Sequence, residues 1–118
     1  MSRAVRTFRA GSDAIIATWR KTIQDLHRRG RKIAIWGGGS KCVAFLTTLK
    51  LNSEIEYVVD INPHKWGAYL PGTGHKTVSP KALAACRPDQ VIVMNPIYQK
   101  EILNELETLG LRAELMPV

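Results

Sequence analysis

The chain has 118 residues, of which 45% are hydrophobic and 23% charged, with two cysteines and a net charge of +7. This length and composition predict one soluble globular domain and exclude both a disordered chain and a disulfide-rich scaffold. No stretch approaches the roughly 18 consecutive apolar residues of a membrane span, and no signal-peptide pattern opens the sequence. We therefore expect a cytoplasmic protein with no membrane partner.

The positive charge is concentrated near the N-terminus. Nine basic and two acidic residues lie within residues 1–32, whereas the rest of the chain is balanced. A basic segment can contact nucleic acid or another acidic surface. Few aromatic side chains accompany these charges to stack on bases, so nucleic acid is the least favoured partner. A solvated helix face, or a segment that meets another domain, explains the charge better.

The chain order of the predicted elements indicates an α/β fold. Residues 1–11 show no periodicity and predict a flexible N-terminus, and residues 12–118 form a single domain. Apolar residues at helical spacing predict a first helix that begins at Ser12 or Asp13 and ends at Gly30. We then expect a strand at 32–36, a helix at 41–49, a strand at 55–60, an ordered loop or small hairpin at 62–77, a short helix at 80–86, a strand at 90–94, a helix at 97–109 and a strand at 112–116. This alternation predicts a mainly parallel sheet covered by helices on both faces, preceded by an N-terminal helix.

The strongest local signal is a glycine turn between the first predicted strand and its helix. The turn reads Gly37-Gly38-Gly39-Ser40-Lys41, and its glycines allow the backbone to approach a ligand closely. The hydroxyl of Ser40, the ammonium of Lys41 and the N-terminal N–H groups of the helix would all suit a phosphate. The alternative is a tight strand-to-helix turn with an exposed lysine.

Two further strand ends are expected to meet this turn at one edge of the sheet. Asp60 follows the second strand, 23 positions after Gly37, close to the interval of a ribose-binding acid, although it could equally cap the turn at Asn62. Residues 95–98 follow the third strong strand. The loop at 69–74 is rich in glycine and carries Tyr69, and it either covers a ligand or packs against a neighbouring domain. No spacing predicts a metal site or a catalytic triad.

Five blocks of residues, in this order, resemble one family. They are Ile33-Ala-Ile-Trp-Gly-Gly-Gly-Ser-Lys41, Val43-Ala-Phe-Leu46, Glu56-Tyr-Val-Val-Asp-Ile-Asn-Pro63, Tyr69-Leu-Pro-Gly-Thr-Gly74 and Val91-Ile-Val-Met-Asn-Pro-Ile-Tyr98. The family is the C-terminal domain of S-adenosylmethionine-dependent C-methyltransferases, including those that act on nucleotide-linked deoxysugars. The resemblance implies a Rossmann-like three-layer sandwich that binds a nucleotide-sugar substrate.

The resemblance also divides the expected roles between domains. Such enzymes have an N-terminal zinc-binding region and a central methyl-donor domain, so S-adenosylmethionine is expected in that partner domain and no cofactor or catalytic residue in this one. The substrate-binding residues that it implies are Gly37, Gly39, Ser40, Lys41, Asp60, Asn62, Tyr69, Thr73, Asn95 and Tyr98.

The chain departs from the family pattern at Gly38 and Cys42, where alanine and glycine are usual, and it lacks the cysteine cluster for zinc. It is thus expected to be a fragment of a larger enzyme or a stand-alone binding module, and in neither case is the isolated domain expected to be active. Two alternative functions stay open: a module that docks on a partner through its basic first helix, and a small NAD-type nucleotide-binding domain.

Overall fold

The computed structural model describes residues 13–70 and 72–118, so the predicted flexible N-terminus lies outside the described residues. Five strands form one sheet in the order β3-β2-β1-β4-β5, and each neighbouring pair is parallel. The strands are β1 (Ile33–Trp36), β2 (Ile55–Val59), β3 (Thr77–Val78), β4 (Gln90–Val93) and β5 (Glu114–Pro117). The predicted parallel sheet is therefore confirmed.

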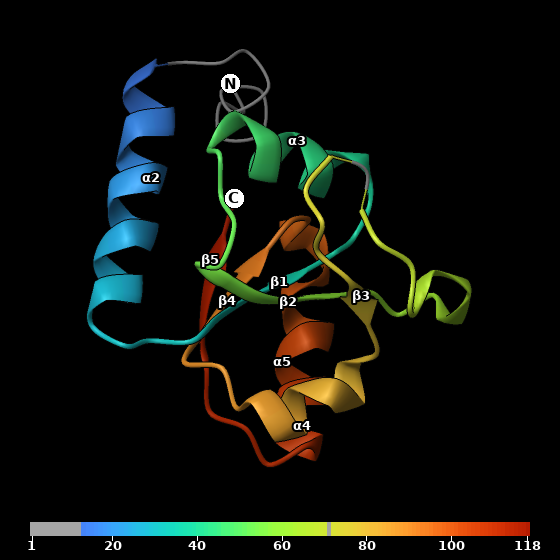
Figure 1. Cartoon of the computed structure of the whole chain (residues 1–118). Coiled ribbons are helices and arrows are strands. Elements are labelled where there is room, and N and C mark those ends of the chain that lie inside the picture. Colours follow the sequence, from blue (N-terminus) through green and yellow to red (C-terminus); the bar gives the residue numbers. More distant parts are fainter. Residues whose placement is uncertain (1–12, 71) are drawn as a thin grey trace.

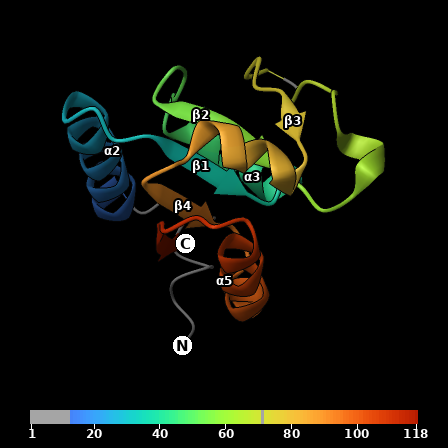
Figure 2. The ribbon, with the colours of Figure 1, turned by 90° about the horizontal axis from the view of Figure 1, so that it is seen from below.

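Helices cover both faces of the sheet, as Figures 1 and 2 show. One layer holds α2 (Asp13–Arg28) and α3 (Ser40–Thr48), and the other holds α4 (Leu83–Cys86) and α5 (Gln99–Thr108). The structure also has three short 3₁₀ helices. One, η1 (Pro63–Lys65), lies in the loop after β2, whereas η2 (Pro80–Ala82) and η3 (Pro96–Tyr98) lead directly into α4 and α5. This arrangement is the expected Rossmann-like three-layer sandwich with an N-terminal helix. Across the described part of the chain, no helix combines the length and hydropathy needed to cross a bilayer.

The alternation of side chains along β1 links two hydrophobic cores. Ile33 and Ile35 face α2 and α3, whereas Ala34 and Trp36 face α4 and α5. Both faces of a parallel strand are buried in this way, which explains the continuous apolar run in the sequence. The α2 stripe joins the first core, where Trp19 meets Phe45 of α3 edge to face, with ring centroids 5.4 Å apart.

The segment between β2 and α4 contains a strand that the sequence pattern did not predict. An isolated antiparallel bridge between Tyr69 and Lys76 makes the expected small hairpin, and the chain then enters β3, which pairs with β2. The Thr77 N–H donates to the Ala68 carbonyl at 2.9 Å. Because β3 is only two residues long and follows a loop rich in glycine, it has no periodicity of its own to detect.

Candidate functional site

A cavity of about 420 Å³ opens at the carboxyl edge of the sheet. The strand order reverses between β1 and β4, and α3 leaves β1 on one face while α5 follows β4 on the other. Open α/β sheets bind their ligands at this kind of switch point. The cavity is lined by Trp36, Gly37, Asp60, Ile61, Met94, Asn95, Tyr98, Glu101, Ile102 and Glu105.

The glycine turn forms one border of this cavity, and steric constraints determine which residue can occupy the first position of the turn. Gly37 has φ +118°, and a Cβ there would lie 3.1 Å from the Cβ of Met94. Its N–H donates to the Val59 carbonyl at 2.7 Å, which ties the turn to the end of β2. The turn therefore requires glycine at this position.

Asp60 organises the backbone where β2 ends. Its Oδ2 accepts the Gly38 N–H at 3.1 Å and its Oδ1 accepts the Asn62 N–H at 2.9 Å. The ammonium of Lys65 lies 3.7 Å from Oδ2, and the indole N–H of Trp66 donates to the Asp60 carbonyl at 2.7 Å. The carboxylate thus acts as the turn cap that the sequence allowed, while it also lines the cavity.

Lys41 places a positive charge at the switch point. It lies in the first turn of α3, and its Nζ donates to the Met94 carbonyl at 2.6 Å, across the gap between β1 and β4. Gly39 is the N-cap of α3, and the first turn holds no acidic residue. Ser40 begins the helix, although its side chain lies outside what the structure describes. The positive end of the helix and a lysine ammonium therefore point to an anion at this edge.

The opposite wall of the cavity is acidic. Among the described residues, Asp60, Glu101 and Glu105 line the cavity, whereas no lysine, arginine or histidine does. Trp36, only 8% exposed, adds an aromatic surface. Sequence reasoning included Asp60 but missed Glu101 and Glu105, although two glutamates one turn apart on the last helix were a readable signal.

Four of the ten residues expected in the site line the cavity: Gly37, Asp60, Asn95 and Tyr98. Gly39, Lys41 and Asn62 lie beside it through the contacts described above. The side chain of Asn62 accepts the His64 N–H at 3.0 Å, and that of Asn95 accepts the Ile97 N–H at 3.3 Å, so both asparagines also shape their turns.

Of the other three expected residues, Ser40 has a side chain outside what the structure describes, and Tyr69 and Thr73 lie away from this cavity. Tyr69 is 68% exposed on the hairpin. Thr73 lines a separate cavity of about 330 Å³, next to the beginning of β2. The structure therefore does not bring the hairpin tip to the switch point.

Neither cysteine offers a reactive thiol. Burial, together with the carboxylate of Asp60, raises the pKa of Cys42 to about 12, with Lys65 opposing the shift. Burial also raises the pKa of Cys86. Among residues 13–70 and 72–118, no three His, Cys, Asp or Glu side chains come together as metal ligands would.

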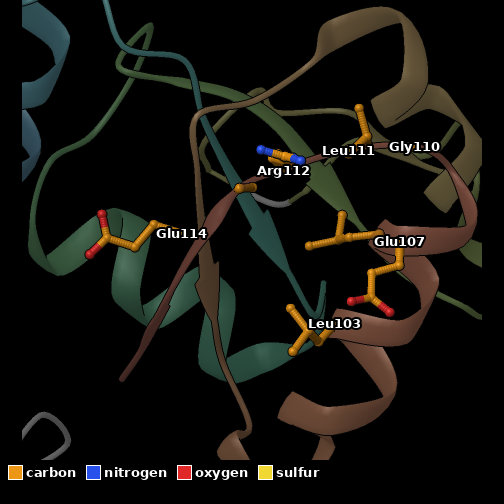
Figure 3. A pocket seen from close by; sticks show the side chains of 8 residues that line it. Leu103, Glu107, Gly110, Leu111, Arg112 and Glu114 are labelled. Atoms are coloured by element: carbon orange, nitrogen blue, oxygen red, sulfur yellow. The ribbon is translucent and has the colours of Figure 1, made fainter.

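A larger cavity, of about 670 Å³, lies at the opposite edge of the sheet (Figure 3). Its lining comes from one stretch of the chain, residues 103–114, which runs from within α5 through the following loop to the first residue of β5. Charged groups of both signs, such as Glu107 and Arg112, border it. Because this lining is a single stretch of the chain, the ends of several strands do not converge on it as they do at the switch point.

Residues 2–113 match the family model described as the C-methyltransferase C-terminal domain. A search of curated proteins gave no match. Among solved structures, RSP, a Rex-family repressor, aligns with a TM-score of 0.52 at 15% identity, over 75% of this chain and 52% of its own. A chorismate mutase/shikimate 5-dehydrogenase fusion protein from Clostridium acetobutylicum aligns with a TM-score of 0.43 at 18% identity, over 81% and 47%. The chain spans about half the length of either structure, and the first likeness shows the fold alone.

Proposed function

The chain belongs to the C-methyltransferase C-terminal domain family, and from this premise we propose that it holds a nucleotide-linked sugar for methylation by another domain. The carrying observation is that the cavity is lined by Gly37, in the same turn that leads through the N-cap Gly39 into the anion-compatible N-terminus of α3. A nucleotide-linked sugar needs both features, since it joins charged phosphates to a polar, uncharged or cationic ring.

Each side of the site would bind a different part of this ligand. The phosphates lie toward the N-terminus of α3 and the ammonium of Lys41, where oriented N–H groups and a positive charge favour anions. The cavity beside α5 takes another part of the ligand, because its carboxylates would repel phosphate.

The domain contributes position rather than chemistry. S-adenosylmethionine, bound by a separate domain, would supply the methyl group. This domain holds the acceptor so that the transfer occurs within one complex, which can lower the barrier by about 7–11 kcal/mol in well-oriented reactions. The methyl donor itself carries no phosphate for the glycine turn to bind, which supports a separate donor site.

Titration of the ¹⁵N-labelled chain tests this proposal. Thymidine diphosphate and its hexose conjugates should shift the amide signals of residues 37–41, and the conjugates should also shift those of residues 95–105. S-adenosylmethionine and NAD should bind more weakly than the conjugates. Lys41→Met should weaken diphosphate binding at least about tenfold, since a charge-assisted contact contributes about 1.5–3 kcal/mol.

Lys81→Met serves as the matched control, because this exposed lysine lies in η2, remote from the cavity lining. It should leave every affinity unchanged. Absence of shifts with all nucleotide sugars would overturn the proposal.

A further inference from the structure

His75 connects the hairpin (residues 67–70 and 72–77) to the turn that precedes β2. Its ring Nε2 lies 2.8 Å from the carbonyl oxygen of Asn52, a residue 23 positions away in the chain. A carbonyl oxygen can only accept a hydrogen bond, so Nε2 must carry the proton and donate it. The contact therefore requires either the neutral Nε2–H tautomer or a doubly protonated ring.

The second ring nitrogen of His75 decides between these two states. Its Nδ1 is buried and has no hydrogen-bond partner among the described residues. In the neutral ring this atom bears only a lone pair, so a single uncharged acceptor is left unpaired. In the doubly protonated ring it would bear an N–H of a cation with no acceptor, and a buried charged donor without a partner costs considerably more free energy. The folded hairpin therefore favours the neutral ring.

The charged groups around His75 do not compensate for a second proton. Glu54, in the turn before β2, interacts electrostatically with both His75 and His27 of α2. Glu56 of β2 and Lys76 of the hairpin line the same cavity as His75. The two carboxylates would favour a charged ring, whereas Lys76 and a protonated His27 would oppose it. None of the four is buried, so solvent screens them, and the missing acceptor at Nδ1 has the larger effect.

The hairpin leads from His75 to the border of the candidate site. The His75 carbonyl accepts the Leu70 N–H at 2.8 Å, which closes the hairpin. Two residues later the chain enters β3, the edge strand that pairs with β2 (Figure 1). The carbonyl of Val78, the last residue of β3, accepts the Asp60 N–H at 3.2 Å. A movement of the hairpin can therefore reach the residue that organises the glycine turn.

We propose that His75 is a pH-sensitive switch: its neutral ring holds the hairpin to the Asn52 carbonyl, and protonation of the ring releases the hairpin. Histidine is the side chain whose charge ordinarily changes between about pH 5 and 8. In the released hairpin both ring nitrogens face water, so this form binds one proton more and acidification favours it. Release loosens β3 and, through it, the backbone at Asp60. The switch is independent of which ligand the domain binds.

Nuclear magnetic resonance of the free ¹⁵N-labelled chain tests the switch between pH about 7.5 and about 5.5. At the higher pH the ring nitrogen signals of His75 should identify the Nε2–H tautomer. On acidification the protection of the Leu70 and Thr77 amides from hydrogen exchange, corrected for intrinsic rates, should fall about three- to tenfold, as expected for the loss of one hydrogen bond. The amide signals of Gly38 and Asp60 should move over the same pH range.

Two substitutions separate the hydrogen bond from the proton. His75→Ala removes the donor and should give low protection at both pH values. His75→Gln supplies an N–H donor that does not titrate, so protection should stay within about twofold of the native value at the higher pH and should not fall on acidification. His64→Gln is the matched control, because the exposed His64 lies in η1, outside the hairpin, and its substitution should preserve the pH response. Circular dichroism checks that each variant is folded.

Three results would contradict the switch. They are an Nδ1–H tautomer of His75 at the higher pH, hairpin amides that stay fully protected in His75→Ala, and a pH response that survives in His75→Gln. The last of these would mean that another group takes up the proton. If the hairpin opens while the signals of Gly38 and Asp60 stay in place, the link from β3 to the glycine turn is refuted.

Discussion

Gly37 and Gly38 are adjacent in one turn, but their surroundings impose different requirements. Gly37 combines φ +118° with a Cβ position 3.1 Å from the Met94 side chain. At Gly38 a Cβ would make ordinary contacts of 3.4–3.5 Å with Val58, Asp60 and Thr77. A run of three glycines thus contains one that is required by its conformation and one that is replaceable.

Alanine substitution should separate these two positions. Gly37→Ala should lower the free energy of unfolding by about 1–3 kcal/mol, because it forces a side chain into a left-handed conformation and a crowded space. Gly38→Ala should be neutral or raise it by about 0.4–1 kcal/mol through the unfolded state. Urea denaturation of both variants measures the difference, and equal losses would contradict the assigned geometry.

The Cys42 thiol predicts a pH dependence of stability. The thiol ionises at its ordinary value of 9.0 when unfolded, whereas its pKa in the folded protein is about 12. Between these values the folded state retains a proton that the unfolded state releases, so the free energy of unfolding falls as pH rises.

Urea denaturation between pH about 8 and about 10.5 should show a steeper loss for the native chain than for Cys42→Ala, by up to about 1.4 kcal/mol per pH unit. Comparison with the variant removes the contribution of other groups that titrate there. Parallel pH profiles would show that the thiol ionises freely in the folded state.

At the scale of elements, Asp60 joins β2 to the glycine turn and to η1. Asp60→Ala leaves the N–H groups of Gly38 and Asn62 without their acceptor and should lower the free energy of unfolding by about 2–4 kcal/mol. The amide signals of Gly37 and Asn95 should also move, because both line the same cavity as Asp60.

Asp89 provides a matched control at the opposite edge of the sheet. Its carboxylate accepts the Lys32 N–H at 2.8 Å and lies 3.7 Å from Arg31, so its substitution removes a similar structural contact. Asp89→Ala should also destabilise the chain, but it should leave the signals of Gly37 and Asn95 in place. Equal disturbance of the cavity by both variants would show that Asp60 has no special role in shaping it.

The sequence predicted most elements because their signals are local. The apolar run and glycine turn at β1 can be recognised within a few residues, and so can the apolar stripe of α2. Contacts between distant segments have no such signature. The Lys41 ammonium meets a carbonyl 53 positions away, and Glu101 and Glu105 resemble a solvated helix face until the cavity is known. The edge strand β3 was missed for the related reason that its two residues are defined by pairing alone.

For the whole molecule, topology places the candidate site and the cores in one framework. The strands contribute alternate side chains to two cores and end together at the edge where the cavity opens. The glycine turn and Asp60 therefore depend on strands held from both faces, although they lie outside either core. Stable positioning of a ligand requires that the two layers of helices act as one unit.

Substitutions that shorten buried side chains on opposite faces of the sheet test whether the two helix layers unfold together. Ile23 of α2 and Leu106 of α5 are both fully buried, each in a different core. Ile23→Ala and Leu106→Ala should each lower the free energy of unfolding by about 2–4 kcal/mol, as expected for cavities in packed cores. Each variant should still unfold in a single transition, because β1 belongs to both cores.

Fluorescence of Trp19 and Trp36 reports the two faces separately, in chains whose other tryptophans are replaced by phenylalanine. The urea midpoints from the two probes should coincide within each truncation variant and with the midpoint from circular dichroism. If Ile23→Ala shifted only the Trp19 transition, α2 and α3 would unfold independently of the opposite layer. A coincident shift instead means that a defect behind α2 weakens the whole sheet, including the turn at Gly37 that borders the ligand cavity.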